Sequence, residues 1–263
     1  MIKVSRFGDP SLPPLVLLHG FMGAKEDWQP LMPKLSQVFH CICVDLPGHG
    51  QSEWLLPSPG LNEAAHAIVS LLSNLGHKQF HLLGYSLGGR IALHIAQQHP
   101  QKLLSLTLES AHPGLQSEPL KQARLQADNI WLQRLETIPL VEFLTLWYQQ
   151  PVFADLTKQQ QAALIKLRSN NQADALLNCY QTTSLALQQD LRKIPDSLGC
   201  ITNVMVGQQD KKFSALAKKW AQDTPINLIE VADAGHNIHS IEPNTFTTLL
   251  FQHLPIAGQS KDD

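Results

Sequence analysis

The chain has 263 residues, which is enough for one large α/β domain or two small ones. Hydrophobic residues make up 43% of it and charged residues 16%, so a substantial apolar core is expected. A formal net charge of −2 and a pI of about 6.6 argue against a general affinity for nucleic acid or anionic lipid.

The hydrophobic segments are short and scattered along the chain. The longest aliphatic runs have the length of a strand and fall far short of a membrane span. Residues 1–8 lack the apolar stretch of a secretory signal. We therefore expect a cytoplasmic protein without membrane or nucleic-acid partners, and we expect it to be a monomer.

Short β-type runs alternate with amphipathic stretches toward both ends of the chain. The expected strands cover residues 15–18, 40–44, 80–83, 104–108, 201–206 and 227–231. The expected helices between them include residues 62–75, 87–99 and 214–223. This alternation predicts an α/β fold with a mostly parallel sheet that is flanked by helices on both faces.

The middle of the chain, residues 113–195, is different because it contains no convincing strand. Helices are expected there at residues 118–135, 140–148, 157–168 and 173–187. A helical insertion in an α/β frame is typical of a cap over the strand ends. We therefore expect a core of residues 1–112 and 196–256, a helical cap of residues 113–195 and a disordered tail of residues 257–263.

The most informative motif is the Gly-x-Ser-x-Gly sequence at residues 84–88. It follows an apolar strand-like run and opens a stretch with helical spacing. At such a junction the motif is typical of a nucleophile elbow, in which glycines permit a sharp turn that exposes the serine hydroxyl. The sequence therefore predicts Ser86 as the reactive residue of an α/β-hydrolase fold.

A serine hydroxyl becomes reactive when a histidine takes its proton and an acid orients the histidine. In this fold the acid and the histidine follow the serine in that order. Asp210 and His236 both follow predicted strands and complete that order. Asp210 on its own would also suit a helix N-cap, Glu109 is a rival acid, and Asp233 is disfavoured because it lies too near His236 in sequence.

The loop at residues 19–21, His-Gly-Phe, follows the first strong strand. In hydrolase folds this loop and the residue after the nucleophile supply the two amides of an oxyanion hole, here Phe21 and Leu87. His49 lies in the turn-rich segment after the next strand, and we interpret it as a scaffold residue.

Three arginines suggest the class of ligand. Arg90 lies one helical turn beyond Ser86, while Arg124 and Arg168 lie in the expected cap. Arginine is well suited to bidentate recognition of carboxylates, so together they predict a small-molecule substrate with several carboxylates. Each alone is more often a solvated surface residue, so the prediction depends on the three together. The cysteine and histidine spacing does not predict a metal site.

Several motifs together resemble a known family. The elbow, the His-Gly-Phe loop and the Asp-Leu-Pro-Gly-His-Gly segment resemble the α/β-hydrolase superfamily. The segments GYSLGGR, HPGLQ, WYQQPVF, LRSNN and AGHN, which begin at residues 84, 112, 147, 167 and 234, resemble the MenH family. These are the 2-succinyl-6-hydroxy-2,4-cyclohexadiene-1-carboxylate synthases. The resemblance extends from about Val16 to Leu254.

The resemblance implies a lyase rather than a hydrolase. Members of the family remove a proton from a cyclohexene-carboxylate intermediate of menaquinone biosynthesis and expel pyruvate, without a metal or an organic cofactor. By this resemblance Ser86 is the base, His236 makes it basic and Asp210 orients the histidine. Phe21 and Leu87 are the oxyanion-hole residues. The implied substrate-binding residues are Tyr85, Arg90, Arg124, Trp147 and Arg168, although ordinary core packing is a serious alternative for Trp147.

Two other functions remain compatible with the same residues. The first is a carboxylic-ester or thioester hydrolase, in which Ser86 would be acylated. The second is a non-catalytic, ligand-binding protein with the α/β-hydrolase fold. The complete set of serine, aspartate and histidine argues against the second, since a binding protein needs none of them.

Overall fold

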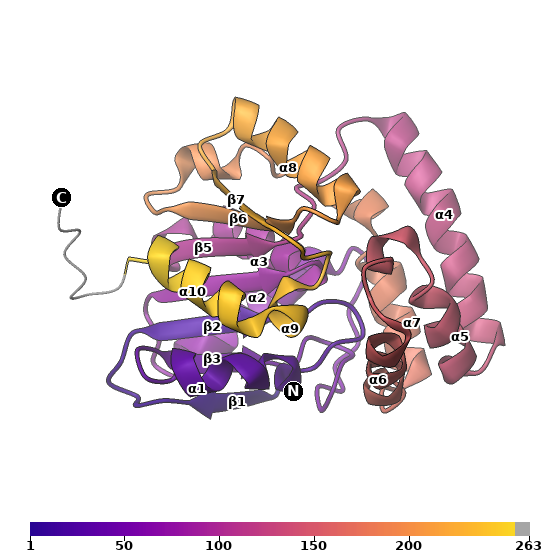
Figure 1. Ribbon diagram of the computed structural model, residues 1–263, viewed down its shortest axis with the longest axis horizontal. Coiled ribbons are helices and arrows are strands. Elements are labelled where there is room, and N and C mark those ends of the chain that lie inside the picture. The colour runs from indigo at the N-terminus through magenta and orange to yellow at the C-terminus, as the bar shows by residue number, and fades with distance from the viewer. Residues whose placement is uncertain (256–263) are drawn as a thin grey trace.

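The computed structural model describes residues 1–255, and the expected disordered tail lies outside the described residues. Seven strands form one sheet in the order β1-β3-β2-β4-β5-β6-β7 (Figure 1). The strands are β1 (Val4–Phe7), β2 (Pro14–Leu18), β3 (His40–Val44), β4 (Phe80–Tyr85), β5 (Leu103–Glu109), β6 (Thr202–Gly207) and β7 (Asn227–Val231). Every neighbouring pair is parallel except β1 and β3, which confirms the expected α/β class.

Strand β1 is the element of the sheet that the hydrophobic pattern did not predict. It is four residues long and only partly buried, so it carries little of the apolar signal that marks a strand. It pairs antiparallel with β3 at the edge of the sheet, with Val4 opposite Val44 and Phe7 opposite Cys41. An antiparallel edge strand on an otherwise parallel sheet is common in α/β folds.

Helices pack on both faces of the sheet. One apolar cluster joins the sheet to α2 (Leu61–Asn74), α3 (Leu87–Gln98) and α8 (Lys211–Asp223). A second cluster on the other side involves η1 (Lys25–Leu31), α1 (Met32–Leu35), α9 (Ile238–Ile241) and α10 (Pro243–His253). Each fully buried Leu, Ile, Val or Phe side chain in these clusters contributes about 1.5–3 kcal/mol to folding.

The segment between β5 and β6 is helical, and most of it forms the group of helices at one end of the sheet in Figure 1. It contains α4 (Glu118–Thr137), α5 (Leu140–Trp147), η3 (Pro151–Phe153), α6 (Lys158–Arg168), α7 (Ala173–Thr182), η4 (Leu185–Leu187) and η5 (Ile194–Ser197). The single helix expected at residues 173–187 is instead two elements. The break occurs because the Ser184 hydroxyl accepts the Ala186 amide hydrogen and so begins a new turn.

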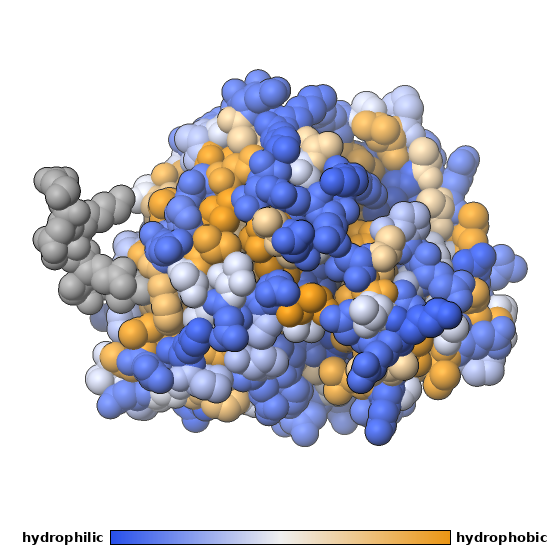
Figure 2. All heavy atoms as spheres, in the orientation of Figure 1, coloured by the Kyte–Doolittle hydropathy of each residue, from blue (hydrophilic) through white to orange (hydrophobic). Residues whose placement is uncertain are grey.

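These helices have an apolar cluster of their own, which includes Phe143, Leu144 and Leu176. Met22, from the loop after β2, is buried in the same cluster, so the helices rest directly on the carboxyl-end loops of the sheet. The face of the molecule drawn in Figure 2 is largely hydrophilic, with smaller exposed apolar groups between the polar residues. Within residues 1–255, no helix combines the length and the apolar character that crossing a membrane requires.

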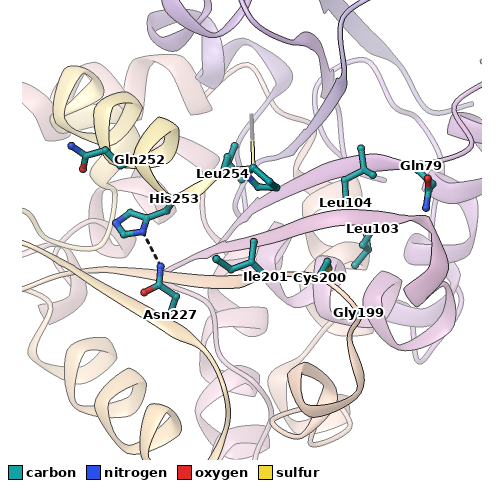
Figure 3. A pocket seen from close by; sticks show the side chains of 11 residues that line it. Gln79, Leu103, Leu104, Gly199, Cys200, Ile201, Asn227, Gln252, His253 and Leu254 are labelled. Carbon is teal, nitrogen blue, oxygen red and sulfur yellow. Dashed lines mark hydrogen bonds between the residues drawn. The ribbon is translucent and has the colours of Figure 1, made fainter. Parts of the chain in front are cut away.

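A hollow of about 890 Å³ lies near the amino ends of β5, β6 and β7. Figure 3 shows Leu103, Ile201 and Asn227 on its wall, where the Asn227 amide donates to His253 Nδ1 at 2.9 Å. Loops at the carboxyl ends of parallel strands form the usual ligand sites of such sheets. This hollow lies at the opposite edge and holds none of the predicted site residues.

Candidate active site

Ser86 occupies a sharp turn between β4 and α3. Its backbone has φ of 50° and ψ of −107°, a conformation that costs a non-glycine residue about 1–3 kcal/mol. The flanking glycines are sterically required. A Cβ on Gly84 would lie 2.5 Å from the Gly88 carbonyl oxygen, and one on Gly88 would lie 2.1 Å from the Leu18 oxygen. The turn therefore has the geometry expected of a nucleophile elbow.

Ser86, His236 and Asp210 form a continuous hydrogen-bonded chain. The Ser86 hydroxyl lies 3.2 Å from His236 Nε2, and His236 Nδ1 lies 2.6 Å from Asp210 Oδ2. The carboxylate can only accept, so it fixes the proton on Nδ1 and leaves Nε2 free to accept from the serine. Asp210 is 4% exposed and His236 is 5% exposed, so water competes little for these bonds.

Asp210 combines the two roles that its sequence position allowed. Its Oδ1 accepts the Phe213 amide hydrogen at 3.1 Å and thereby caps α8, while Oδ2 receives the bond from His236. The rival Glu109 is occupied elsewhere, because its carboxylate accepts from the amide and Nδ1 of His239. Asp233 is exposed to solvent.

The loop between β2 and η1 lies against the elbow. A Cβ on Gly20 would lie 3.5 Å from Ser86 Cβ, so the backbone of this loop adjoins the serine. Within residues 1–255, neither the Phe21 amide nor the Leu87 amide donates a hydrogen bond to another group. Two unpaired amides beside a serine hydroxyl, one of them at a helix N-terminus, suit a developing oxyanion.

His49 supports this loop from beneath. Its Nε2 accepts the Met22 amide hydrogen at 2.9 Å, and its Nδ1 donates to the Pro47 carbonyl at 3.0 Å. Burial, with a smaller contribution from His19, lowers the pKa of His49 to about 3, so the ring is neutral. These contacts belong to a scaffold residue.

Two connected cavities open from Ser86. The small chamber has about 100 Å³ and is lined by Phe21, Ser86, Leu87, Arg90, Arg124, Trp147, Tyr180, Thr183 and Ser184. The large chamber has about 410 Å³ and shares Ser86, Arg124, Trp147 and Tyr180 with the small one. Its other lining residues include Lys212, Phe213 and His236 from the core and Trp131, Pro151 and Phe153 from the helical insertion.

Two of the three predicted arginines line these chambers. Arg90 donates to the Gln188 side chain and to the Thr183 carbonyl, both of which are neutral acceptors. Burial, followed by repulsion from Arg124, lowers the pKa of Arg90 to about 9. Arg124 donates from Nε to Asp128 at 2.7 Å, and its side chain is 30% exposed. Both guanidinium groups therefore retain donors for a bound anion.

Arg168 and Tyr85 are both buried and contact other side chains of the protein. Arg168 forms a bidentate pair with Asp27, at 2.6 and 2.7 Å, and lines neither chamber. Tyr85 is buried and also lines neither chamber, but its ring packs edge-on against His236 at a centroid distance of 5.5 Å. The structure thus shows Arg168 in an ion pair and Tyr85 packed against His236, and the ligand contact expected of both residues stays a prediction.

Trp147 lines both chambers and also packs against aromatic neighbours. Its ring meets those of Phe21 and Tyr180 edge-on at centroid distances of 5.4 and 5.7 Å. Trp147 is therefore both a wall of the two chambers and a packed core residue. Packing of this kind fixes the shape of the cavity.

Several lining residues had not been predicted. Buried Asp128 accepts from Arg124, from the Tyr180 hydroxyl at 2.8 Å and from the Ser184 hydroxyl at 2.6 Å. No motif marked these residues. Lys212 offered one signal, since it stands two positions after Asp210 at the start of α8. Within residues 1–255, no three His, Cys, Asp or Glu side chains gather as metal ligands do.

The fold and the site define the class of protein. The family model described as alpha/beta hydrolase fold matches residues 13–243. The MenH structure from S. aureus superposes with a TM-score of 0.88 over 96% of this chain and 97% of that one. Their sequences are 24% identical, so this similarity establishes the shared fold.

Sequence relatives identify the family within this class. The chain is 38% identical over 250 residues to the 2-succinyl-6-hydroxy-2,4-cyclohexadiene-1-carboxylate synthase of Enterobacter sp. (strain 638), which covers 95% of both chains. It is 40% identical over 239 residues to the synthase of the same name from Salmonella typhimurium, covering 90% of this chain and 91% of the relative. The chain therefore belongs to the family of these synthases.

Proposed function

We propose that this protein is a carbon–oxygen lyase of menaquinone biosynthesis. It converts 2-succinyl-5-enolpyruvyl-6-hydroxy-3-cyclohexene-1-carboxylate to 2-succinyl-6-hydroxy-2,4-cyclohexadiene-1-carboxylate and pyruvate. The observation that carries the proposal is the chain Ser86–His236–Asp210, which opens into chambers lined by Arg90 and Arg124. Family membership at 38–40% identity supports the same reaction.

The reaction begins with proton abstraction at the ring carbon that bears the succinyl group. This carbon is adjacent to a ketone and to the ring double bond, so its proton is acidic. Ser86 Oγ takes the proton while its own proton moves to His236 Nε2, and Asp210 stabilises the imidazolium that results. A serine–histidine pair therefore acts as a base without forming an acyl intermediate.

The electrons left on the ring then move toward the leaving group. Negative charge develops on the succinyl ketone oxygen, and the amides of Phe21 and Leu87 stabilise it there. The ring double bond shifts and the bond from carbon to the enolpyruvyl oxygen breaks, which leaves the two conjugated double bonds of the product. The released enolpyruvate takes up a proton on carbon and becomes pyruvate.

Substrate carboxylates are held by cations in a protein of nearly neutral charge. Arg90 and Arg124 each present donors to the chambers, and the α4 helix brings Arg124 over the serine. We infer that residues 113–195 act as a cap that closes the site to water. Loss of one arginine that holds a carboxylate is expected to cost about 2–4 kcal/mol in transition-state binding.

The proposal is tested by measuring pyruvate release. The purified protein receives the succinyl-enolpyruvyl substrate, and a lactate dehydrogenase coupled assay follows pyruvate. We expect Ser86→Ala to lower kcat by about 10³-fold or more, because it removes the base but leaves the binding groups in place. Release by the parent protein no faster than by Ser86→Ala would refute the proposal.

Short acyl esters and thioesters serve as the second substrate set in the same assay series. The proposed site binds its substrate through several carboxylates, so neutral esters should turn over slowly. Fast ester turnover without pyruvate release would identify a hydrolase. Tight binding of the substrate without turnover would identify a ligand-binding protein.

A further inference from the structure

The large chamber contains a cation that no sequence motif indicated. Lys212 of α8 lines this chamber together with Arg124 and His236. It follows Asp210 by two residues, so one loop-to-helix turn carries both the partner of His236 and this lining lysine. The Lys212 Nζ lies 5.8 Å from the centroid of the Phe213 ring, and that ring lies 4.7 Å from the His236 ring.

Lys212 has no carboxylate partner among residues 1–255, although three other lysines in this range form ion pairs. Partial desolvation, followed by repulsion from Arg124, lowers the pKa of Lys212. Arg124 has its own counterion in Asp128. A carboxylate between Lys212 and Arg124 would relieve their repulsion and compensate the partial desolvation of the ammonium group.

The chamber sizes indicate which part of the substrate Lys212 meets. Small-molecule sites commonly have volumes of about 300–1,000 Å³, and the large chamber, at about 410 Å³, falls in this range. The small chamber, at about 100 Å³, lies well below it and has room only for a compact group. The ring with its succinyl arm therefore belongs in the large chamber, on the side of Lys212.

We propose that Lys212 binds a carboxylate of the ring-bearing part of the substrate, together with Arg124, in the large chamber. The inference rests on the proposed function. It adds a substrate-binding residue from α8 of the core, whereas Arg124 comes from α4 of the helical insertion. The ligand chemistry is that of a dicarboxylate carried on a six-membered ring.

The neighbouring lysine provides a matched control. Lys211 and Lys212 are both exposed, but Lys211 lines a different hollow, together with Ser214, Lys218 and Glu230. Lys211→Gln removes the same charge from the same turn of α8 without touching either chamber. Lys212→Gln removes the charge at the chamber wall, and Lys212→Arg keeps a cation there.

The experiment compares these three variants with the parent in pyruvate release and in inhibition. The inhibitors are pyruvate and 2-succinylbenzoate, an aromatic analogue of the ring-bearing product. We expect Lys212→Gln to raise KM and the Ki of 2-succinylbenzoate about tenfold, with kcat changed less than about threefold. The Ki of pyruvate should change less than about twofold, and Lys212→Arg should recover most of the loss.

The lysine assignment is overturned if Lys212→Gln and Lys211→Gln have the same KM and the same Ki values. It is also overturned if the Ki of pyruvate rises as much as that of 2-succinylbenzoate. Calorimetric titration of 2-succinylbenzoate separates this failure from that of the proposed function. Binding weakened only in Lys212→Gln, without pyruvate release by the parent, would retain the lysine site and reject the lyase.

Discussion

The Glu109 carboxylate accepts two hydrogen bonds from His239, one from the backbone amide at 3.0 Å and one from Nδ1 at 2.7 Å. Both residues are buried, with exposures of 0% and 1%. The backbone carbonyl of Glu109 also accepts the Ser86 amide hydrogen at 2.9 Å. Glu109 therefore connects the nucleophile elbow to the segment that carries His236, and it helps to set the distance between the serine and the histidine.

Removal of this connection should reduce both stability and turnover. Glu109→Ala leaves two buried donors of His239 unpaired, so we expect the free energy of unfolding to fall by about 3 kcal/mol. Glu109→Gln keeps one acceptor oxygen and should cost about 1–2 kcal/mol. Urea denaturation measures the first effect. In the assay kcat should fall more than KM rises, and an unchanged kcat in the folded variant would separate Glu109 from the positioning of Ser86.

The two roles of Asp210 can be separated by substitution. Asparagine caps helices about as well as aspartate does, so Asp210→Asn should unfold close to the temperature of the parent. It should nevertheless lower kcat by about 10³–10⁴-fold, because an amide no longer fixes the histidine tautomer or stabilises the imidazolium. The free energy of unfolding of Asp210→Ala should be about 1 kcal/mol lower than that of Asp210→Asn, because alanine cannot cap the helix. A kcat for Asp210→Asn within about tenfold of the parent would remove Asp210 from the proton-transfer chain.

The contact of Ser86, Asp210 and His236 was predictable because each follows an expected strand. Parallel strands place their carboxyl ends at one edge of the sheet, so residues far apart in sequence must meet there. The sheet itself was predictable because its interior strands are buried and rich in apolar residues. Strand β1 was not, because four partly exposed residues lack such a run.

The sequence did not predict how the cations are paired. Arg168 and Asp27 are 141 residues apart, and neither lies in a pattern that indicates the other. Asp128 had no marker either, because an aspartate within an exposed helix is usually solvated. Hydrophobic periodicity reports which face of a helix is buried, but the partner of a buried charge is set by tertiary packing. For this reason the arginines that line the two chambers could be identified only from the structure.

Substitutions in the Arg168–Asp27 pair should mainly lower the free energy of unfolding. Both side chains are nearly buried, at 7% and 6% exposure, so replacing one leaves the other charge without compensation. We expect Arg168→Met to lower the free energy of unfolding by about 3–5 kcal/mol, and Arg168→Met/Asp27→Leu to recover a large part of it. Urea denaturation of the two single variants and the double variant measures the coupling. Additive losses would contradict a buried pair.

The same pair should contribute to stability in a way that depends on pH. Burial opposes ionisation of Asp27, but Arg168 outweighs it and holds the pKa of this carboxyl below its ordinary value of 3.8. The stabilisation is therefore present above the unfolded pKa and is lost as the pH falls below it through the folded pKa. Urea denaturation of the parent and of the double variant is compared between about pH 5 and pH 3. The free energy of unfolding should fall more steeply with falling pH in the parent. Parallel curves would contradict this assignment.

Three buried histidines and the half-buried His112 should make the fold sensitive to mild acid. Burial lowers the pKa of His49 and His112 to about 3, and of His81 and His94 to about 4. In the unfolded chain such groups take up protons near pH 6.5. Below that pH the unfolded state binds more protons, so the free energy of unfolding falls as the pH falls.

The contribution of a single histidine to this pH dependence can be measured at His94. Each such histidine contributes a slope that approaches about 1.4 kcal/mol per pH unit. His94→Gln removes one titrating group and keeps a polar side chain beside Asn62, which His94 Nδ1 contacts at 2.7 Å. Between pH 6.5 and 5.0 we expect the free energy of unfolding of this variant to fall by about 1.6 kcal/mol less than that of the parent, as measured by urea denaturation. Equal losses would show that His94 is protonated in the folded state.

Ligand binding should protect α4 more than α6 from hydrogen exchange. Only Asp128 and Leu135 of α4 are buried, so this helix has few contacts of its own, and a carboxylate held by Arg124 would add one. The end of α6 is already fixed to the core by the Arg168–Asp27 pair and by the bond from Asn171 to the Met22 carbonyl at 2.9 Å.

Exchange is followed by mass spectrometry with and without 2-succinylbenzoate. We expect slower exchange across residues 118–137, little change across residues 158–171, and no protection in Arg124→Gln at the same ligand concentration. Because α4 and α6 belong to the same helical insertion, α6 serves as the internal control. Equal protection of both helices would indicate that the whole insertion closes as one body, and no protection of α4 would show that Arg124 does not hold the ligand.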